Sequence, residues 1–188
     1  MSNKYRGMTI AEAAELRGES PEEAIVNLII EDGSRIQCIY FSMSEENVRK
    51  KIMLPWVSFD SDAGSYSDIS KDFITHPRAF GSFARVLGKY VREEKLITME
   101  EAIRRLTGFP ANNLGIKNRG YLKPGYFADV VVFDPEIIED KATFEKPLQF
   151  AVGVEDVFVN GVQVLSGSEH TGEYPGRFVK GAGYSPSN

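Results

Sequence analysis

The sequence changes its pattern near residue 115, and this change indicates the fold class. Before it, helical patterns alternate with short apolar segments, whereas after it short β-like runs follow one another. Alternation of helix and strand is typical of βα units around a parallel sheet. A complete (β/α)8 barrel usually needs about 250 residues, and the chain has 188. We therefore expect an α/β protein and exclude a complete barrel that also carries another domain.

Polar side chains mark where several helices begin. In a capping box, a hydroxyl accepts a hydrogen bond from the first turn and a glutamate three residues later reaches back. This pattern occurs at Thr9 with Glu12, Ser20 with Glu23, and Thr98 with Glu101. Gly33 is expected to end the second of these helices. Two more helices are expected, one over residues 44–52 and one after Pro77.

Two segments before residue 115 have the composition of strands. Residues 35–41 are rich in β-branched and aromatic side chains. Residues 55–60 form a short apolar segment that we interpret as a buried strand, because Pro55 opens it and few residues follow.

The β-like runs beyond residue 115 contain one strong hairpin signal. Residues 129–133, 154–159 and 162–165 are expected to be strands, and Asn160 and Gly161 separate the last two. An Asn-Gly pair suits a type I′ turn because both central residues of that turn need φ > 0. We expect a small β layer that ends in an extended tail from Ser166.

Charge and apolar length argue against two classes of partner. The chain has 22 Lys and Arg residues and 27 Asp and Glu residues, which give a net charge of −5. The basic residues form no stripe along the sequence, so nucleic acid is not expected as a partner. The longest apolar stretch, residues 24–30, is far shorter than the roughly 20 residues that cross a bilayer, so no membrane partner is expected. The single Cys38 and a start without a signal-like apolar core favour a cytoplasmic location.

Histidine is scarce, which limits metal chemistry. The sequence contains only His76 and His170, and neither an H-x-H nor an H-E-x-x-H motif. A catalytic zinc site usually takes three protein ligands, commonly two or three of them histidine. A self-contained zinc hydrolase is therefore not expected.

Two carboxylates, Asp60 and Asp62, follow the predicted strand over residues 55–60. In parallel α/β folds the strand ends carry catalytic groups, and an aspartate there can bind a metal or act as a general base. The alternative is that these residues are turn aspartates that bind nearby backbone N–H groups. Asp68 and Asp72, further along the same loop, are expected to be solvated.

Arg78 precedes a predicted helix and is a candidate for binding an anion. Its guanidinium is shaped to bind a carboxylate through two parallel hydrogen bonds. The alternative is that Arg78 pairs with an aspartate of the preceding loop and that His76 donates to a backbone carbonyl. Trp56 and Tyr66 are expected to be packing residues.

A series of short motifs resembles one enzyme family. In order along the chain they are residues 59–64 (FDSDAG), 76–81 (HPRAFG), 87–92 (LGKYVR), 101–107 (EAIRRLT), 110–111 (PA), 119–120 (RG), 123–125 (KPG), 128–129 (AD) and 157–161 (VFVNG). Together they closely resemble the C-terminal part of the N-acyl-D-amino-acid deacylases, or D-aminoacylases, of the metal-dependent amidohydrolase superfamily. The likeness runs from about Lys4 to Lys180.

The resemblance implies a particular fold and zinc chemistry. It implies the last βα units of a distorted (β/α)8 barrel in residues 1–115, followed in residues 116–188 by strands of a small β-sandwich and a tail. By the same resemblance, Asp62 would be a zinc ligand and the proton acceptor for the metal-bound water. Arg78 would bind the α-carboxylate of an N-acyl-D-amino acid. Asp60 stands where many relatives have glycine, which adds a negative charge close to Asp62.

The family's other metal ligands have no match in this sequence. These are an H-x-H on the first strand, a cysteine, glutamate or modified lysine, and two later histidines. The resemblance therefore implies zinc in the complete enzyme but none held by this chain alone, and we expect this chain alone to be inactive. Two alternatives stay open: a non-catalytic module that self-associates or completes a partner chain carrying the missing ligands, and an amidohydrolase acting on cyclic amides.

Overall fold

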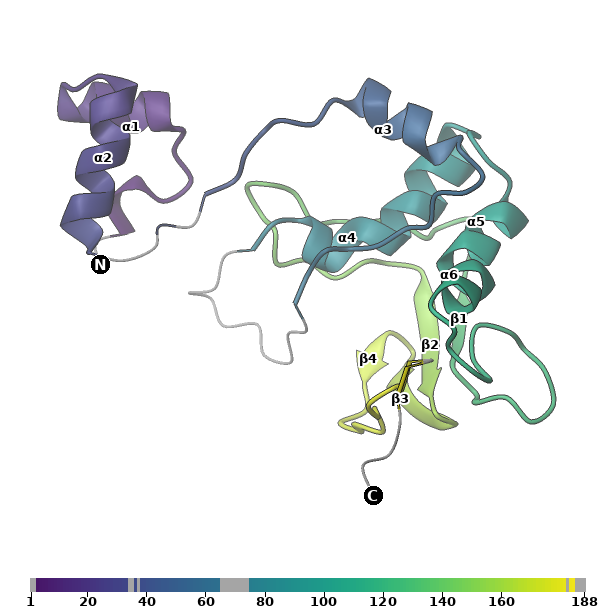
Figure 1. The fold of residues 1–188 in the computed structure, drawn as a ribbon. Helices are drawn as coiled ribbons and strands as arrows, with labels where there is room; N and C mark the ends of the chain where they lie inside the picture. Colours follow the sequence, from purple (N-terminus) through teal and green to yellow (C-terminus); the bar gives the residue numbers. More distant parts are fainter. Residues whose placement is uncertain (1–2, 34–35, 37, 65–74, 182, 185–188) are drawn as a thin grey trace. The chain divides into compact units, whose positions relative to one another are not determined.

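The computed structural model describes residues 3–33, 36, 38–64, 75–181 and 183–184, and it contains two compact units, Met1–Ser42 and Met43–Asn188 (Figure 1). The elements are the 3₁₀ helix η1 (Asn3–Tyr5), α1 (Ile10–Arg17), α2 (Pro21–Asp32), α3 (Glu45–Ile52), α4 (Arg78–Arg85), the π-helix η2 (Val86–Glu93), α5 (Met99–Leu106), α6 (Gly108–Asn113), β1 (Val130–Phe133), β2 (Val154–Val159), β3 (Val162–Ser166) and β4 (Glu169–His170).

The first unit is a pair of short helices, α1 and α2. Both predicted capping boxes are confirmed, and Gly33 ends α2 in the left-handed conformation with φ 66°. The two helices are joined by Arg17, whose guanidinium binds Glu31 at 2.6 Å. The predicted strand over residues 35–41 is wrong: residues 36 and 38–41 are irregular. A strand needs a hydrogen-bonded neighbour, and the described part of this unit contains no strand to pair with it.

Three of the helices in the second unit start as the sequence predicts. Ser44 caps α3, a helix follows Pro77, and Thr98 caps α5 by accepting the Glu101 N–H at 3.2 Å. The third capping box is only half formed, because the Glu101 carboxylate binds Arg104 at 2.7 Å instead of reaching back.

Helices α4 and η2 run on continuously and pack closely against the segment over residues 138–140. A Cβ atom added at Gly88 would lie 2.5 Å from the Ile138 carbonyl oxygen, so only glycine allows this approach. Arg92, one turn further along, donates to the same oxygen at 2.6 Å.

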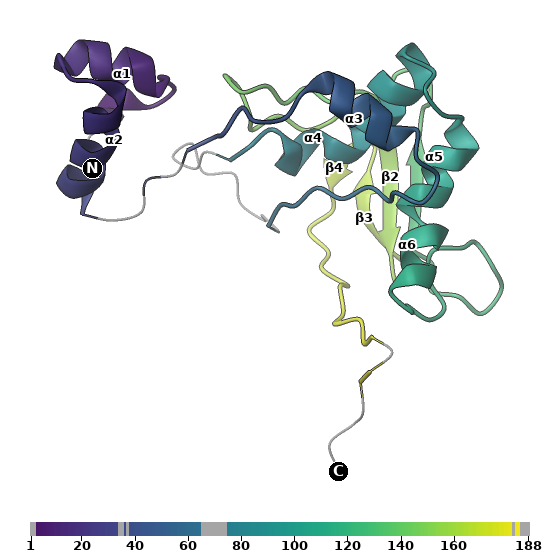
Figure 2. The ribbon, with the colours of Figure 1, turned by 45° about the horizontal axis from the view of Figure 1, so that its top comes forward.

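The sheet is an antiparallel meander in the order β1-β2-β3-β4. Asn160 and Gly161 connect β2 to β3 with φ 51° and 83°, so the predicted hairpin is confirmed. In Figure 2 the tail beyond β4 runs away from the sheet as an extended segment.

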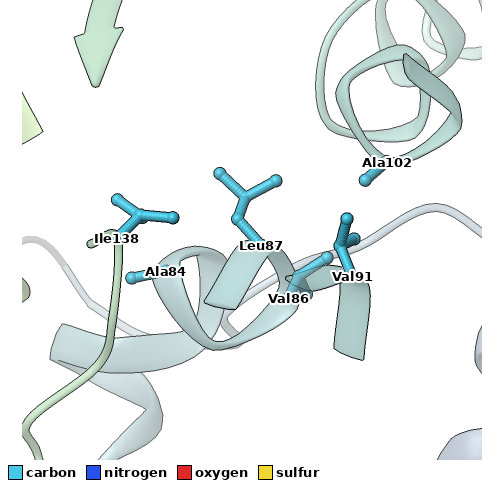
Figure 3. Packing of buried hydrophobic residues seen from close by; sticks show 6 residues of the cluster. All are labelled: Ala84, Val86, Leu87, Val91, Ala102 and Ile138. Carbon is cyan, nitrogen blue, oxygen red and sulfur yellow. The ribbon is translucent and has the colours of Figure 1, made fainter. Parts of the chain in front are cut away.

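One apolar core joins the helices and the sheet of the second unit. Its buried residues are Ala84, Val86, Leu87, Val91, Ala102 and Ile138 (Figure 3). Phe133 of β1 and Val154 of β2 pack against this cluster, as does Phe59.

The predicted buried strand over residues 55–60 is wrong. The segment is irregular, and Trp56, expected to be a packing residue, is 69% exposed. The carbonyls of Pro55 and Val57 accept hydrogen bonds from arginine side chains and not from a neighbouring strand. Among the described residues, every strand lies beyond residue 129 and every strand pair is antiparallel. The fold is thus α/β with a small antiparallel sheet, and the expected parallel βα pairing is not formed; the barrel and sandwich assignments and the division at residue 115 remain predictions.

Candidate functional site

Asp62 lies in the irregular segment that follows α3, and its backbone has an uncommon conformation. Its φ is 46°, in the left-handed region that non-glycine residues seldom occupy. Aspartate tolerates this region better than most side chains because its carboxylate is short and polar. Such outliers concentrate at functional sites, where the surrounding structure holds them in place.

Arg78, the first residue of α4, is brought to Asp62. Its Nη2 lies 2.8 Å from Asp62 Oδ2, and the two side chains are 46% and 83% exposed. One alternative from the sequence is that Arg78 pairs with an aspartate of the preceding loop, and this is the contact that the structure shows. An exposed ion pair contributes only about 0–1 kcal/mol. Each partner can therefore be separated from the other at small cost.

His76 lies two residues before the first residue of α4. Its Nδ1 accepts a hydrogen bond from the Arg78 N–H at 3.1 Å, and its ring meets Phe144 edge-on at 5.1 Å between centroids. The prediction that His76 donates to a backbone carbonyl is wrong for this nitrogen, because the first turn of a helix presents N–H groups that need acceptors. Burial, and then the neighbouring Arg78 charge, lowers the pKa of His76, which favours the neutral ring.

Four further residues were singled out in the sequence, and the structure describes one of them, Asp60. Asp60 Oδ1 accepts the Ser61 N–H at 2.7 Å, as in the turn alternative. Tyr66, Asp68 and Asp72 lie outside the described residues.

Sequence reasoning did not single out two arginines of α5. Arg105 is 0% exposed and donates to the carbonyls of Ile52 and Val57, while Arg104 donates to that of Pro55. Burial lowers the pKa of the Arg105 guanidinium. One signal was available: Arg105 lies three residues after the buried Ala102, hence on the apolar face of the helix.

The described residues do not fit a zinc site. They contain no group of three or more His, Cys, Asp or Glu side chains placed to hold a metal ion. Asp62 instead has a cation, Arg78, at its carboxylate. At this position the described part of the chain thus offers one carboxylate, whereas a catalytic zinc needs about three protein ligands. In the described residues there is also no helix with the length and apolar character to span a bilayer.

The sequence from residue 6 to residue 165 matches the amidohydrolase family. The chain belongs to this family. The amidohydrolase is 37% identical to the D-aminoacylase of Alcaligenes xylosoxydans xylosoxydans over 173 residues, which cover 92% of this chain and 34% of that protein. The resemblance to the D-aminoacylases is therefore confirmed.

Two solved structures are similar to the amidohydrolase. The crystal structure of a D-aminoacylase has a TM-score of 0.79 and 35% identity, over 94% of this chain and 36% of that one. The N-acyl-D-glutamate deacylase of Bordetella bronchiseptica, solved with zinc and a phosphonate mimic of the tetrahedral intermediate, has a TM-score of 0.74 and 39% identity, over 84% of this chain and 31% of that one. The chain thus spans about a third of the length of these relatives.

Proposed function

We propose that this amidohydrolase chain supplies the C-terminal part of an enzyme that hydrolyses the amide bond of N-acyl-D-amino acids, and that this chain alone is inactive. The observation that carries the proposal is the contact between Asp62 and Arg78. The two residues belong to separate deacylase-like motifs, and they meet at 2.8 Å. The similarity to a D-aminoacylase and to an N-acyl-D-glutamate deacylase supports the substrate class.

Arg78 would bind the α-carboxylate of the substrate. A substrate carboxylate can offer two oxygens to the guanidinium, and such bidentate pairs are stronger than single contacts. It would therefore displace Asp62, whose exposed pair with Arg78 is weak. Binding of substrate at Arg78 would thus leave the Asp62 carboxylate free to accept a proton.

Asp62 would act as general base and then as general acid. It accepts a proton from the attacking water as the oxygen forms a bond to the amide carbon, and it returns the proton to nitrogen as the C–N bond breaks. The products are a carboxylate and a D-amino acid. The described residues do not hold the metal of the relatives, so its ligands would have to come from elsewhere.

The second candidate is a non-catalytic module that associates through apolar surface. Ile25, Val26, Ile29 and Ile30 form one face of α2 and are 44–71% exposed. Soluble monomers rarely leave such a face uncovered. Self-association or a partner chain that carries the missing metal ligands would cover it. A cyclic amide substrate without a carboxylate would give Arg78 nothing to bind.

A chimera tests the proposal. The matching third of the Alcaligenes xylosoxydans D-aminoacylase is replaced by this chain, and the release of D-amino acid from N-acyl-D-amino acids and the opening of a cyclic amide are measured with zinc present. The proposal predicts deacylation by the chimera. A chimera that folds and retains zinc but does not deacylate, or that opens only the cyclic amide, contradicts it.

A further inference from the structure

The segment that carries Asp62 has little backbone hydrogen bonding of its own. We define the Asp62 arm as residues 53–62, from the end of α3 to Asp62. The last backbone–backbone hydrogen bond along it joins the Val57 N–H to the Leu54 carbonyl at 3.1 Å. From Ser58 to Gly64 there is no further bond of this kind to another residue that the structure describes. Other contacts must therefore hold the arm in its conformation.

Arg105 makes the most buried of these contacts. Its Nε donates to the Val57 carbonyl at 2.5 Å, and its Nη1 donates to the Ile52 carbonyl at 2.6 Å. The guanidinium carbon lies 4.5 Å from the centroid of the Phe59 ring. One arginine thus contacts both ends of the stretch over residues 52–59.

Arg104 extends this contact to the middle of the arm. Its Nη2 donates to the Pro55 carbonyl at 3.0 Å. The Glu101 carboxylate holds the same guanidinium through two hydrogen bonds of 2.7 and 2.9 Å. Two adjacent residues of α5 therefore bind three carbonyls, one at the end of α3 and two in the first half of the arm.

The buried charge of Arg105 has no salt-bridge partner among the described residues. Glu101 is near enough to favour the charged form, but it forms its salt bridge with Arg104. Arg105 Nη2 is buried without a hydrogen-bond partner. A buried cation of this kind is costly, and replacing it with an apolar side chain of similar size is often neutral or stabilising. Global stability alone therefore does not explain an arginine at this position.

We propose that Arg105, assisted by Arg104, is the positioning residue for Asp62. Phe59 is held against Arg105 and against the apolar core. Asp62 is only three residues further on, and each residue spans at most about 3.5 Å. Fixing Phe59 thus keeps Asp62 within about 10 Å of it, in the region where its carboxylate meets Arg78. The catalytic role of Asp62 rests on the proposed function, whereas the proposal that Arg105 restrains the arm does not depend on it.

The test uses the full 188-residue chain and the variant Arg105→Met. The amide of Val57 reports on the arm by hydrogen exchange, and the amide of Val157 in β2 reports on the sheet. Trp56, the only tryptophan, reports arm motion through fluorescence anisotropy. We expect Val57 to exchange at least about tenfold faster in the variant, with Val157 changed less than about twofold, and the Trp56 anisotropy to fall.

The matched control is Arg92→Met. Arg92 also donates to two backbone carbonyls, those of Pro135 and Ile138, and none of its hydrogen bonds to described residues is to the arm. The control should leave Val57 exchange unchanged. Should Arg105→Met not fold, Arg105→Lys and Arg104→Met, which each remove part of the contact, are compared in the same way.

Two results would overturn the inference. One is Val57 exchange that stays the same in the Arg105 and Arg104 variants. The other is equal acceleration at Val57 and Val157, which would mean that Arg105 only stabilises the whole unit. None of these measurements depends on activity, so a failed chimera and a failed positioning role are distinguishable.

Discussion

Asp62 and Arg78 form an ion pair that is exposed to solvent, and the proposed function depends on this exposure. A buried pair would resist separation, because each charge would lose its only partner in a medium of low dielectric constant. Arg78 and Asp62 are 46% and 83% exposed. Under the proposed function, a substrate carboxylate would replace Asp62 at Arg78, and the ion pair would be the arrangement of the site before substrate binds.

The variant Arg78→Ala tests the role of the guanidinium. In the chimera we expect KM for an N-acyl-D-amino acid to rise about ten- to a hundredfold with kcat nearly unchanged, since a charged hydrogen bond made equally in ground and transition states is lost. Arg85→Ala is the control, because Arg85 pairs with Asp140 and not with Asp62. A KM equal to that of the parent chimera would argue against carboxylate binding by Arg78.

The lowered pKa of His76 predicts that the stability of the chain depends on pH. Its pKa is lowered in the folded chain, so as pH falls through about 6.5 the unfolded chain binds a proton first. The free energy of unfolding should therefore decrease as pH is lowered from 7.5 to 5.5. Urea unfolding across this range measures it. His76→Phe keeps a ring against Phe144 and should lose this part of the dependence; identical pH profiles for both proteins would contradict the assignment.

At the scale of elements, helix starts and turns were predicted correctly from short sequence signals, whereas two strands that need a distant pairing partner were not. Capping at Thr9 and Ser20 and the turn at Asn160 depend on a few adjacent residues, and all are formed. The strands expected over residues 35–41 and 55–60 depend on neighbours that pair with them, and none of the described strands pairs with either segment.

The same distinction applies to the candidate site. Asp62 and Arg78 belong to recognisable motifs, and their pairing was one of the alternatives. The buried Arg105 was not foreseen, because helical periodicity assigns apolar residues to a buried face. Its partners are backbone carbonyls about 50 residues away in sequence, which no side-chain pattern reveals.

The substitution Gly88→Ala tests how closely η2 packs against Ile138. An alanine Cβ there would lie 2.5 Å from the Ile138 carbonyl oxygen, and backbone cannot move aside as a side chain can. We expect Gly88→Ala to lower the free energy of unfolding by about 1–3 kcal/mol, measured by urea denaturation. Gly176→Ala, which meets no atom within 4 Å, is the control. Equal stability of the Gly88 variant and the parent would contradict the close approach.

At the scale of the whole molecule, the chain spans about a third of the length of its relatives. Within the first unit, the α2 face formed by Ile25, Val26, Ile29 and Ile30 is exposed apolar surface. Under the second candidate function, this face would contact another polypeptide.

Light scattering after size exclusion measures this tendency. We expect the apparent mass to exceed that of one chain and to rise with concentration, because burial of apolar surface drives association. Ile30→Lys places a charge on the α2 face and should lower the apparent mass. A monomer at every concentration, for both proteins, would argue against association through α2.

The most direct test of the account is the reaction of the purified 188-residue chain with zinc and an N-acyl-D-amino acid, followed by release of D-amino acid. The account predicts no release above that of the Asp62→Asn variant, because the described residues supply one carboxylate and no set of metal ligands. Zinc-dependent turnover that the Asp62→Asn substitution abolishes would show that this chain holds a complete site, and would contradict the account.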